Sequence, residues 1–201
     1  YENNPQHPAN IIKTIEMFAD KDAIIVTDVG QHQMWTAQNF KFNMPRTFLT
    51  SGGLGTMGFG LPAAIGAALA KPDRQIICIT GDGSLLMNIQ ELATLADLNL
   101  NIKIIVLNNG HLGLVRQQQE LFYDRNYFAT KFLNAPNFSL IADGFKIYAY
   151  SIMNYNEDFE DVLSKEFNRC GAALIDAPID SAENVLPIVP PGAANYEMIG
   201  A

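Results

Sequence analysis

Residues 75–109, QIICITGDGSLLMNIQELATLADLNLNIKIIVLNN, decide the fold of this chain. Two apolar runs, 75–80 and 102–107, are short, rich in Ile and bounded by turn residues, as is typical of buried parallel strands. Between them, residues 84–98 carry apolar side chains at steps of four, three and four, which predicts a helix with one apolar face. A right-handed crossover then brings the carboxyl ends of both strands to the same edge of a sheet.

The rest of the chain repeats this alternation. We expect further strands at 23–29, 46–50, 147–151 and 172–177, and helices at 10–19, 31–40, 59–70, 112–123, 139–143 and 157–169. About six strands with intervening helices predict an α/β fold, with an open, doubly wound, mainly parallel six-stranded sheet and helices on both faces. One domain, 1–186, accounts for all of them, and the Pro-rich tail at 187–201 is expected to be irregular.

Composition limits the classes of function. The chain has 201 residues, of which 48% are hydrophobic, and this is enough for one domain with a full core. Lys and Arg number 13 against 21 Asp and Glu, and the net charge of −8 argues against nucleic acid as a partner. Two cysteines, Cys78 and Cys170, are too few for a disulfide framework and are interpreted as reduced thiols.

Hydropathy and the start of the chain bear on its location. No apolar stretch reaches the roughly 18 residues that a bilayer span needs, and the first residues lack signal-peptide features. We therefore expect a cytoplasmic protein with no membrane association. The chain begins at Tyr1 without an initiator Met, which suggests an excised domain or a processed chain.

Asp82 and Asn109 follow directly on the two strands, in GDG at 81–83 and NN at 108–109. Neighbouring strands lie only about 4.8 Å apart, so a carboxylate and an amide oxygen can reach one ion. Mg²⁺ prefers oxygen ligands and takes only one or two from side chains, the others coming from water and phosphates. The two glycines let the backbone approach a phosphate, and Ser84 opens a helix whose N–H groups can face an anion. The pattern predicts a magnesium site beside a phosphate.

Each of the two residues also has a purely structural explanation. Asp82 could cap a helix and Asn109 could turn the chain, and for either residue alone this explanation is favoured. Their joint placement, 27 positions apart across one strand-helix-strand unit, favours the metal site instead.

The pattern of GDG, about 24 residues and NN resembles the thiamine-diphosphate fingerprint. Three further segments are similar to the large subunit of acetolactate synthase, also called acetohydroxyacid synthase: GQHQMW at 30–35, GGLGTMGFGLPAA at 52–64 and VPPGAAN at 189–195. The resemblance covers essentially all 201 residues but only the carboxy-terminal third of that family's chain. GDG with NN identifies the cofactor superfamily, whereas GQHQMW with the tail is narrower and indicates the synthase.

The resemblance implies a thiamine-diphosphate-binding fold with the cofactor at the carboxyl edge of the sheet. The implied cofactor-binding residues are Gly30, Gln31, His32, Gly55, Met57, Gly81, Asp82, Gly83, Ser84, Asn109, His111, Gly113 and Leu114. The implied Mg²⁺ ligands are Asp82, Asn109 and a backbone carbonyl from His111. Gly30, Gln31 and His32 would hold the diphosphate from one side of the cleft. Without the resemblance, His32 would be interpreted as an ordinary surface or core histidine.

Met57 matches the bulky apolar residue that the family places as a wedge under the folded cofactor. Gly55 would offer a carbonyl to the pyrimidine amine. From the sequence alone, Met57 would be interpreted as core filler, because Met packs irregular gaps readily. The matching glycines around it favour the wedge.

The implied reaction is decarboxylation of pyruvate and condensation with a second 2-keto acid, in branched-chain amino-acid biosynthesis. Family members also bind FAD through a central domain that lies outside this sequence, and they form homodimers or tetramers, in some cases with a small regulatory subunit. The activating glutamate comes from the amino-terminal pyrimidine-binding domain of a partner subunit, so no glutamate here, Glu91 included, is assigned to catalysis. We expect the isolated chain to bind cofactor weakly and to be inactive.

Gln118 departs from the family pattern. Most relatives have tryptophan nine residues past the second asparagine, where it contacts the incoming 2-keto acid and favours 2-ketobutyrate over pyruvate. Gln118 therefore predicts a weak preference for 2-ketobutyrate and reduced sensitivity to the herbicidal inhibitors that bind beside that tryptophan. The alternative is a solvated helix residue.

The tail at 187–201 has an implied role of its own. Its Pro-Pro-Gly at 190–192 cannot continue a helix or a strand. Relatives fold this segment over the active site when cofactor is present, so the resemblance implies a lid. In an isolated domain we expect it to be mobile or mispacked.

Three other interpretations remain open. The chain could belong to another thiamine-diphosphate enzyme, such as a 2-keto acid decarboxylase, pyruvate oxidase or glyoxylate carboligase, although GQHQMW and the tail argue against these. It could bind NAD, because GLGTMG at 53–58 fits GxGxxG, but a lone match is weak and the expected downstream acid is already part of GDG. It could also be an inert folding unit or a subunit-contact module.

Overall fold

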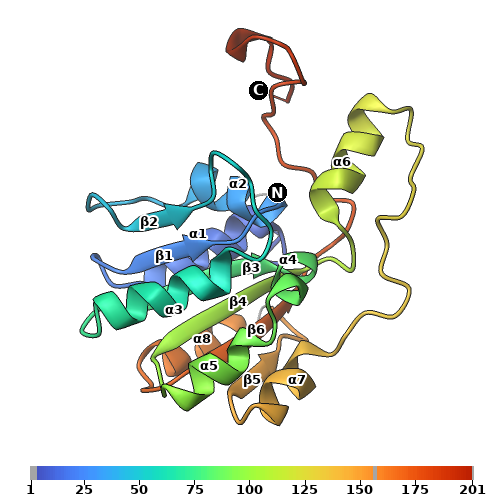
Figure 1. The fold of residues 1–201 in the computed structure, drawn as a ribbon. Coiled ribbons are helices and arrows are strands. Elements are labelled where there is room, and N and C mark those ends of the chain that lie inside the picture. The colour runs from blue at the N-terminus through green and yellow to red at the C-terminus, as the bar shows by residue number, and fades with distance from the viewer. Residues whose placement is uncertain (1–3, 156–157, 201) are drawn as a thin grey trace.

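Six strands form one wholly parallel sheet in the computed structural model, which describes residues 4–155 and 158–200 (Figure 1). The strands are β1 (Ile24–Thr27), β2 (Phe48–Thr50), β3 (Ile76–Gly81), β4 (Ile102–Asn108), β5 (Tyr148–Ser151) and β6 (Ala173–Pro178). Their spatial order is β2-β1-β3-β4-β6-β5. The predicted α/β class and doubly wound parallel sheet are confirmed.

Helices cover both faces of this sheet. They are α1 (Pro8–Phe18), α2 (Gln31–Asn39), α3 (Gly60–Ala70), α4 (Asp82–Met87), α5 (Glu91–Asp97), α6 (Gly113–Phe122), α7 (Phe138–Gly144) and α8 (Phe159–Phe167), followed by the 3₁₀ turn η1 (Asn195–Glu197). The last helix was expected from 157, a position outside the described residues. No helix within the described ranges is both long and apolar enough to cross a bilayer.

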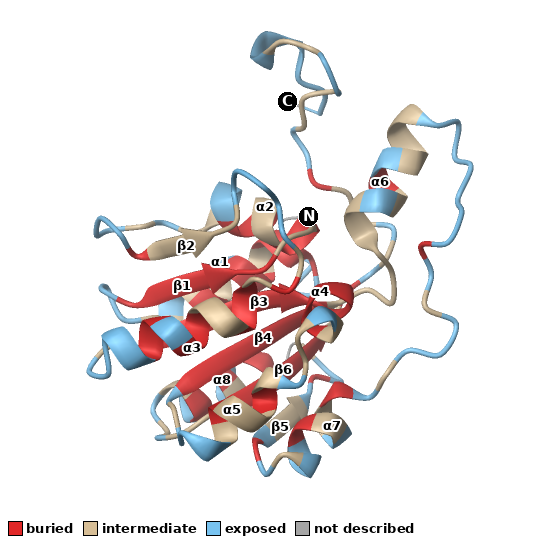
Figure 2. Ribbon diagram, in the orientation of Figure 1, coloured by how far each residue is buried: buried red, intermediate tan, exposed pale blue. Residues whose placement is uncertain are grey.

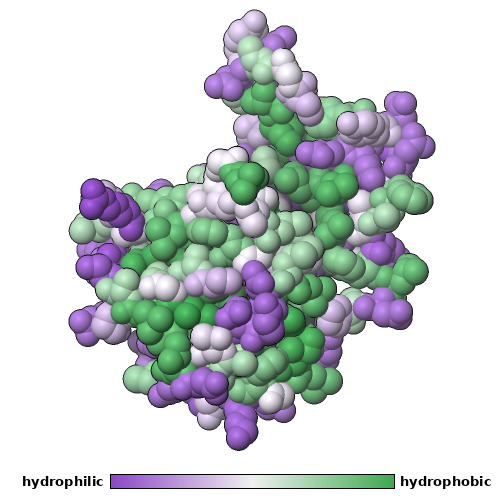
Figure 3. All heavy atoms as spheres, viewed as in Figure 1, coloured by the Kyte–Doolittle hydropathy of each residue, from purple (hydrophilic) through white to green (hydrophobic). Residues whose placement is uncertain are grey.

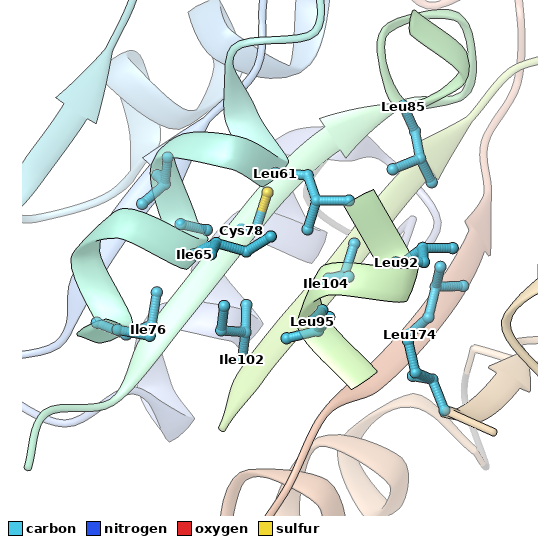
Figure 4. Packing of buried hydrophobic residues seen from close by; sticks show 14 of the residues in the cluster. Leu61, Ile65, Ile76, Cys78, Leu85, Leu92, Leu95, Ile102, Ile104 and Leu174 are labelled. Carbon is cyan, nitrogen blue, oxygen red and sulfur yellow. The ribbon is translucent and has the colours of Figure 1, made fainter. Parts of the chain in front are cut away.

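The core is divided into two layers by the sheet. Successive side chains of a strand point to opposite faces, so Ile76 and Cys78 of β3 join one layer while Ile77 and Ile79 join the other. The first layer is completed by α3, α4, α5 and α7, and the second by α1, α2 and α8. The close view of the first layer shows α3 and α5 packed over β3 and β4 (Figure 4). The central strand β3 is buried along its whole length, and β4 is buried except at its last residue, as expected for strands covered on both faces (Figure 2).

The single helix predicted at 84–98 is wrong, because the segment forms two helices, α4 and α5, with a break at 88–90. Asn88 leaves the helical conformation, with φ −138° and ψ 34°. Its side-chain amide donates to the carbonyl of Gly58, 2.7 Å away on a different segment. A tertiary contact therefore interrupts a helix that the apolar spacing alone would continue.

The register of β3 and β4 positions the site. Cys78 pairs with Ile104 and Gly81 pairs with Leu107, so the two strands end at the same edge of the sheet. Helix α6 and the C-terminal tail lie beyond that edge, and the tail projects from the body of the molecule (Figure 1). Ile188 and Ile199 exchange two backbone hydrogen bonds of 3.0 and 2.9 Å, so the tail doubles back on itself. In the space-filling view, the side of the molecule that carries α3, α5 and α7 shows hydrophobic and hydrophilic residues intermixed (Figure 3).

Candidate functional site

A cleft of about 110 Å³ opens at the carboxyl ends of the central strands. It is lined by every residue that the sequence assigned to the cofactor except Gly55, namely Gly30, Gln31, His32, Met57, Gly81, Asp82, Gly83, Ser84, Asn109, His111, Gly113 and Leu114. Residues that the sequence did not single out also line it: Val29, Trp35, Leu107, Leu112, Val115 and Ile179. Five separate chain segments, 29–35, 57, 81–84, 107–115 and 179, therefore meet at one place.

Two of the predicted positions lie outside this cleft. Gly55 is exposed on the loop before α3, with φ +71°. Gln118 is exposed on α6 and lines a separate depression with Gln119 and Phe122. Val115, one turn earlier on α6, borders both the depression and the cleft.

Asp82 is 3% exposed and has one oxygen without a partner. Its Oδ1 accepts the N–H of Gly83 at 2.9 Å, whereas Oδ2 is buried with no hydrogen bond. Burial raises the pKa of this carboxyl group to about 6, although the N–H groups of Gly83, Gly110 and His111 act in the opposite direction. An unpartnered buried carboxylate oxygen is costly, and a bound cation would remove that cost.

Asn109 presents an oxygen on the same edge. Its Nδ2 donates to Gln31 Oε1 at 3.2 Å, and its Oδ1 accepts the N–H of His111 at 3.0 Å. An amide oxygen has two lone pairs, so one remains for a further partner. Asp82 and Asn109 together offer the hard oxygen donors that Mg²⁺ takes.

The backbone around His111 is held by hydrogen bonds to the segment at 130–132. The imidazole Nδ1 lies 2.8 Å from Asn109 O, so the ring turns back on its own chain. On either side of His111, Leu112 N–H donates to Thr130 O at 2.7 Å and Phe132 N–H donates to Gly110 O at 2.9 Å. The path of the chain, which would place the His111 carbonyl, is therefore defined by a second segment. Among the described residues, no three His, Cys, Asp or Glu side chains gather at one point, so a metal here would depend on amide and carbonyl oxygens.

The glycines of GDG are required by close neighbours. A Cβ on Gly81 would lie 2.8 Å from His32 Nδ1, and one on Gly83 would lie 2.8 Å from Leu112 Cδ2. Real Cβ atoms do not approach so closely, so any other residue at these positions would require the side chain of His32 or Leu112 to shift. The backbone of 81–83 thus forms a narrow wall of the cleft.

His32 is buried beneath this wall, and burial lowers its pKa to about 3. The ring is therefore neutral near pH 7, and its buried Nε2 has no hydrogen-bond partner. A neutral imidazole can offer an N–H to a phosphate but no positive charge. Ser84 is also buried, and its hydroxyl donates to Val29 O at 2.6 Å, which ties the start of α4 to the end of β1.

Met57 is half-buried and lines the cleft. Its position depends on Asp28, a residue that the sequence analysis overlooked. Asp28 Oδ1 accepts the N–H of Gly58 at 2.8 Å, and Oδ2 accepts the N–H of Gly60 at 2.7 Å. The signal was present, because Asp28 follows β1 as Asp82 follows β3, but no glycine pair marks it.

Gln117 was also missed. It is a fully buried residue of α6, and its amide contacts Gln31. It lies in a run of three glutamines at 117–119, and nothing in the sequence distinguishes the buried one from its two neighbours.

Comparison with known proteins identifies the family. Residues 28–177 match the protein family described as "Thiamine pyrophosphate enzyme, C-terminal TPP binding domain"; thiamine pyrophosphate is another name for thiamine diphosphate. The chain belongs to this family. Membership replaces the NAD-binding alternative, and the structure gives a reason: GLGTMG at 53–58 follows the edge strand β2, not the first strand, where a dinucleotide fingerprint belongs.

Within this family, relatives with high identity share one description. The chain is 54% identical over 197 residues to "Acetolactate synthase isozyme 1 large subunit" of Escherichia coli (strain K12), covering 98% of this chain and 35% of that protein. It is 44% identical over 199 residues to isozyme 2 of the same organism, covering 96% and 36%. The acetolactate synthase large subunit of Lactococcus lactis subsp. lactis (strain IL1403) is 44% identical over 199 residues, covering 99% and 34%. The chain spans about a third of the length of these relatives.

A solved structure supports the fold. The thiamine diphosphate-dependent 4-hydroxybenzoylformate decarboxylase of Rhodococcus jostii RHA1 superposes with a TM-score of 0.79 at 27% identity. The match covers 87% of this chain and 32% of that one. This TPP-binding domain therefore has a counterpart in an enzyme described by a different reaction.

Proposed function

We propose that this chain is the cofactor-binding domain of an acetolactate synthase and that it binds thiamine diphosphate through Mg²⁺ in the cleft at the carboxyl edge. The observation that carries the proposal is the buried, unpartnered Oδ2 of Asp82, on the edge where Asn109 presents an amide oxygen. Such an oxygen is costly in a folded protein unless a cation occupies the site. The donors present fit Mg²⁺, which leaves some of its coordination positions to phosphate and water.

Each chain segment has a role in this proposal. Asp82, Asn109 and the His111 carbonyl hold the metal, while Gly30, Gln31, His32, Gly81, Gly83, Ser84, Gly113 and Leu114 line the diphosphate position. Met57, which lines the cleft, would contact the bound cofactor, and the Gly55 carbonyl would be available to its pyrimidine. When bound, thiamine diphosphate supplies the carbanion chemistry that breaks and forms carbon–carbon bonds. The protein residues orient it and exclude water from one side.

The reaction that we propose is condensation of pyruvate, after decarboxylation, with a second 2-keto acid in branched-chain amino-acid biosynthesis. The cleft of about 110 Å³ is smaller than the roughly 300–1,000 Å³ of sites that enclose a drug-sized ligand. We assign one wall of a larger site to residues 1–186 and the role of a lid to 187–201. The proposal assigns the remaining parts to a longer protein: an activating glutamate from a partner subunit's pyrimidine-binding domain, a central FAD-binding domain, a homodimeric or tetrameric assembly and a small regulatory subunit.

Gln118 defines the expected specificity. A tryptophan here would offer an apolar surface to the extra methyl group of 2-ketobutyrate, whereas an exposed amide does not. One methyl group in an apolar contact is worth about 10- to 200-fold in discrimination. The enzyme is therefore proposed to prefer 2-ketobutyrate only weakly, and Gln118→Trp should raise that preference about tenfold without changing the affinity for Mg²⁺.

A chimera tests the proposed function. The chain replaces the matching 35% of the Escherichia coli isozyme 1 large subunit, and the purified protein is supplied with thiamine diphosphate, Mg²⁺, FAD and pyruvate. We expect 2-acetolactate as the product and no activity from the Asp82→Ala chimera. Release of acetaldehyde without condensation would support the rival assignment as a decarboxylase. Absence of turnover in a folded, assembled chimera would reject both.

Direct binding separates cofactor classes more cheaply. The 201-residue chain contains a single tryptophan, Trp35, which lines the cleft and reports on its contents by fluorescence. We expect a response to thiamine diphosphate with Mg²⁺ and none to NAD.

A further inference from the structure

Gln117 forms a two-point bracket with the backbone of Val185. The glutamine is 0% exposed; its Nε2 donates to Val185 O at 2.9 Å and its Oε1 accepts the N–H of Val185 at 2.8 Å. A backbone N–H can only donate and a carbonyl can only accept. The orientation of the Gln117 amide is therefore fixed by the main chain.

That orientation passes to Gln31. Its Nε2 donates to Gln117 Oε1 at 2.8 Å and to Glu183 O at 3.0 Å. Both partners are acceptors, so only the NH₂ end of Gln31 can point toward them. The oxygen of Gln31 must then point the other way, toward Asn109.

Asn109 receives the same constraint. Because Gln31 Oε1 can only accept, Asn109 turns its Nδ2 toward it, at 3.2 Å, and its oxygen toward the N–H of His111, at 3.0 Å. A reversed amide would present N–H groups to the proposed cation site, where Mg²⁺ requires oxygen. The backbone donors and acceptors at 183–185 thus fix the orientation of three side-chain amides in turn, those of Gln117, Gln31 and Asn109.

Gly113 leaves room for this chain of amides. A Cβ at this position would overlap Gln31 Oε1 and would lie 2.5 Å from Asn109 Nδ2. Helix α6 therefore begins with a residue that accommodates the Gln31–Asn109 contact and carries Gln117 one turn later.

We propose that Gln117 is a positioning residue which, through Gln31, fixes the side-chain oxygen of Asn109 toward the metal. The same amide fastens residues 183–185, from which the C-terminal tail departs, to the metal-bearing edge. This inference rests on the proposed function, because it assigns Asn109 to the metal. It adds a residue that does not itself line the cleft.

The chain contains a matched control on the same helix. Gln119 brackets the backbone of Phe128 as Gln117 brackets Val185, with its Nε2 donating to Phe128 O and its Oε1 accepting the Phe128 N–H, both at 3.0 Å. Replacing either glutamine by methionine keeps its length and its helix propensity but removes both hydrogen bonds. Only Gln117→Met also removes the partner of Gln31.

The experiment measures the Kd of Mg²⁺ at a fixed thiamine diphosphate concentration, using the fluorescence of Trp35 in the 201-residue chain. Partners outside the ligand shell typically change metal affinity 10- to 100-fold. We expect Gln117→Met to weaken Mg²⁺ binding at least about tenfold and Gln119→Met to change it less than about twofold. The double variant Gln31→Met/Gln117→Met should bind no more weakly than Gln31→Met alone, because both act along one path.

A conservative variant guards against loss of folding. Gln117→Glu keeps an oxygen for Gln31 and for the Val185 N–H, and its carboxyl group, neutral when buried, can donate to Val185 O. We expect Gln117→Glu to bind Mg²⁺ within about threefold of the unmodified chain. Equal weakening in the Glu and Met variants would instead indicate disturbed packing and overturn the inference.

A ligand-free measurement separates this inference from the proposed function. In the NMR spectrum of the unmodified chain, the Asn109 side-chain NH₂ proton that is bonded to Gln31 should lie downfield and exchange slowly with solvent. In Gln117→Met this proton should move toward the position of a free amide and exchange faster, whereas in Gln119→Met it should be unchanged. If the unmodified chain binds Mg²⁺ and Gln117→Met binds equally well, the positioning role is wrong while the function stands. If the amide signals behave as expected but the unmodified chain binds no Mg²⁺ with the cofactor, the proposed function fails and the assignment of Asn109 to a metal fails with it.

Discussion

Asp28 and Asp82 leave the adjacent parallel strands β1 and β3, and their side chains are almost equally buried, at 1% and 3% exposed. Their hydrogen bonding differs completely. Asp28 accepts three backbone N–H groups, from Val29, Gly58 and Gly60, so both of its oxygens are satisfied by the protein. Asp82 accepts the N–H of Gly83 on one oxygen and leaves the other without a partner. The Asp28 carboxylate has all of its partners within the protein, whereas Asp82 Oδ2 would need a bound ligand, such as a cation, as its partner.

The largest effect should come from removing the satisfied carboxylate. Asp28→Ala leaves three backbone N–H groups without an acceptor, those of Gly58 and Gly60 buried and that of Val29 part-buried, and each buried group costs about 1–3 kcal/mol. We expect the free energy of unfolding in urea to fall by at least about 3 kcal/mol. Asp73→Ala, at an exposed turn residue, is the control and should stay within about 0.5 kcal/mol. If Asp28→Ala lowers the free energy of unfolding by less than about 1 kcal/mol, the proposed difference in hydrogen bonding between Asp28 and Asp82 is wrong.

His32 probes the apolar space between the two strand exits. Burial lowers the pKa of His32 to about 3. Below about pH 6.5, therefore, His32 binds a proton in the unfolded chain but stays neutral in the folded chain. Stability is therefore lost as the pH falls from about 6.5 toward 3. Between pH 7 and pH 5 the unmodified chain should lose about 2 kcal/mol more unfolding free energy than His32→Gln. Parallel pH profiles for the two proteins would mean that the space is wetter than the structure indicates.

Gly113→Ala tests the link between Asn109 and Gln31. The added Cβ would displace that amide contact, at a cost of about 1–2 kcal/mol that a gain of up to about 1 kcal/mol in helix propensity partly offsets. We expect a net loss of about 1 kcal/mol by chemical denaturation, with weaker Mg²⁺ binding. In α3, Gly66 has no atom near its missing Cβ, so Gly66→Ala should instead raise stability by about 0.5–1 kcal/mol. If both substitutions change the free energy of unfolding in the same direction, Gly113 is not crowded as the structure indicates.

Asp82→Asn should change the stability of the ligand-free chain least, by less than about 1 kcal/mol. It removes a buried oxygen that has no partner, so little native bonding is lost. Magnesium-dependent binding of thiamine diphosphate should nevertheless disappear in the fluorescence titration. The paired variant Asp28→Asn should do the opposite, destabilising the chain because an NH₂ group then meets backbone N–H groups. A common outcome for both substitutions would contradict the distinction.

Much of the fold and the location of the cleft follow from local pattern. The spacing of 75–109 is sufficient because apolar periodicity sets the elements and the handedness of crossovers places both strand ends at one edge. The hydrogen-bonding roles of Asp28 and Gln117 and the break at Asn88 do not follow from this spacing, for one physical reason. Each depends on a partner far along the chain: Gly58 for Asp28 and Asn88, and Val185 for Gln117. Hydrogen bonds between distant segments leave no periodicity in the sequence.

Two glutamines of α6 each form a pair of hydrogen bonds with the backbone of another segment, at Phe128 and at Val185. Gln119 bonds to Phe128 and Gln117 bonds to Val185, so if this helix unwinds, each of these two backbone positions loses two hydrogen bonds. The sheet does not depend on these contacts, because its strands are joined by their own ladders. Helix α6 and the loop that contains Phe128 should consequently open as one cooperative unit before global unfolding, with amide protons that exchange at a common rate, whereas Val185 remains packed in the core.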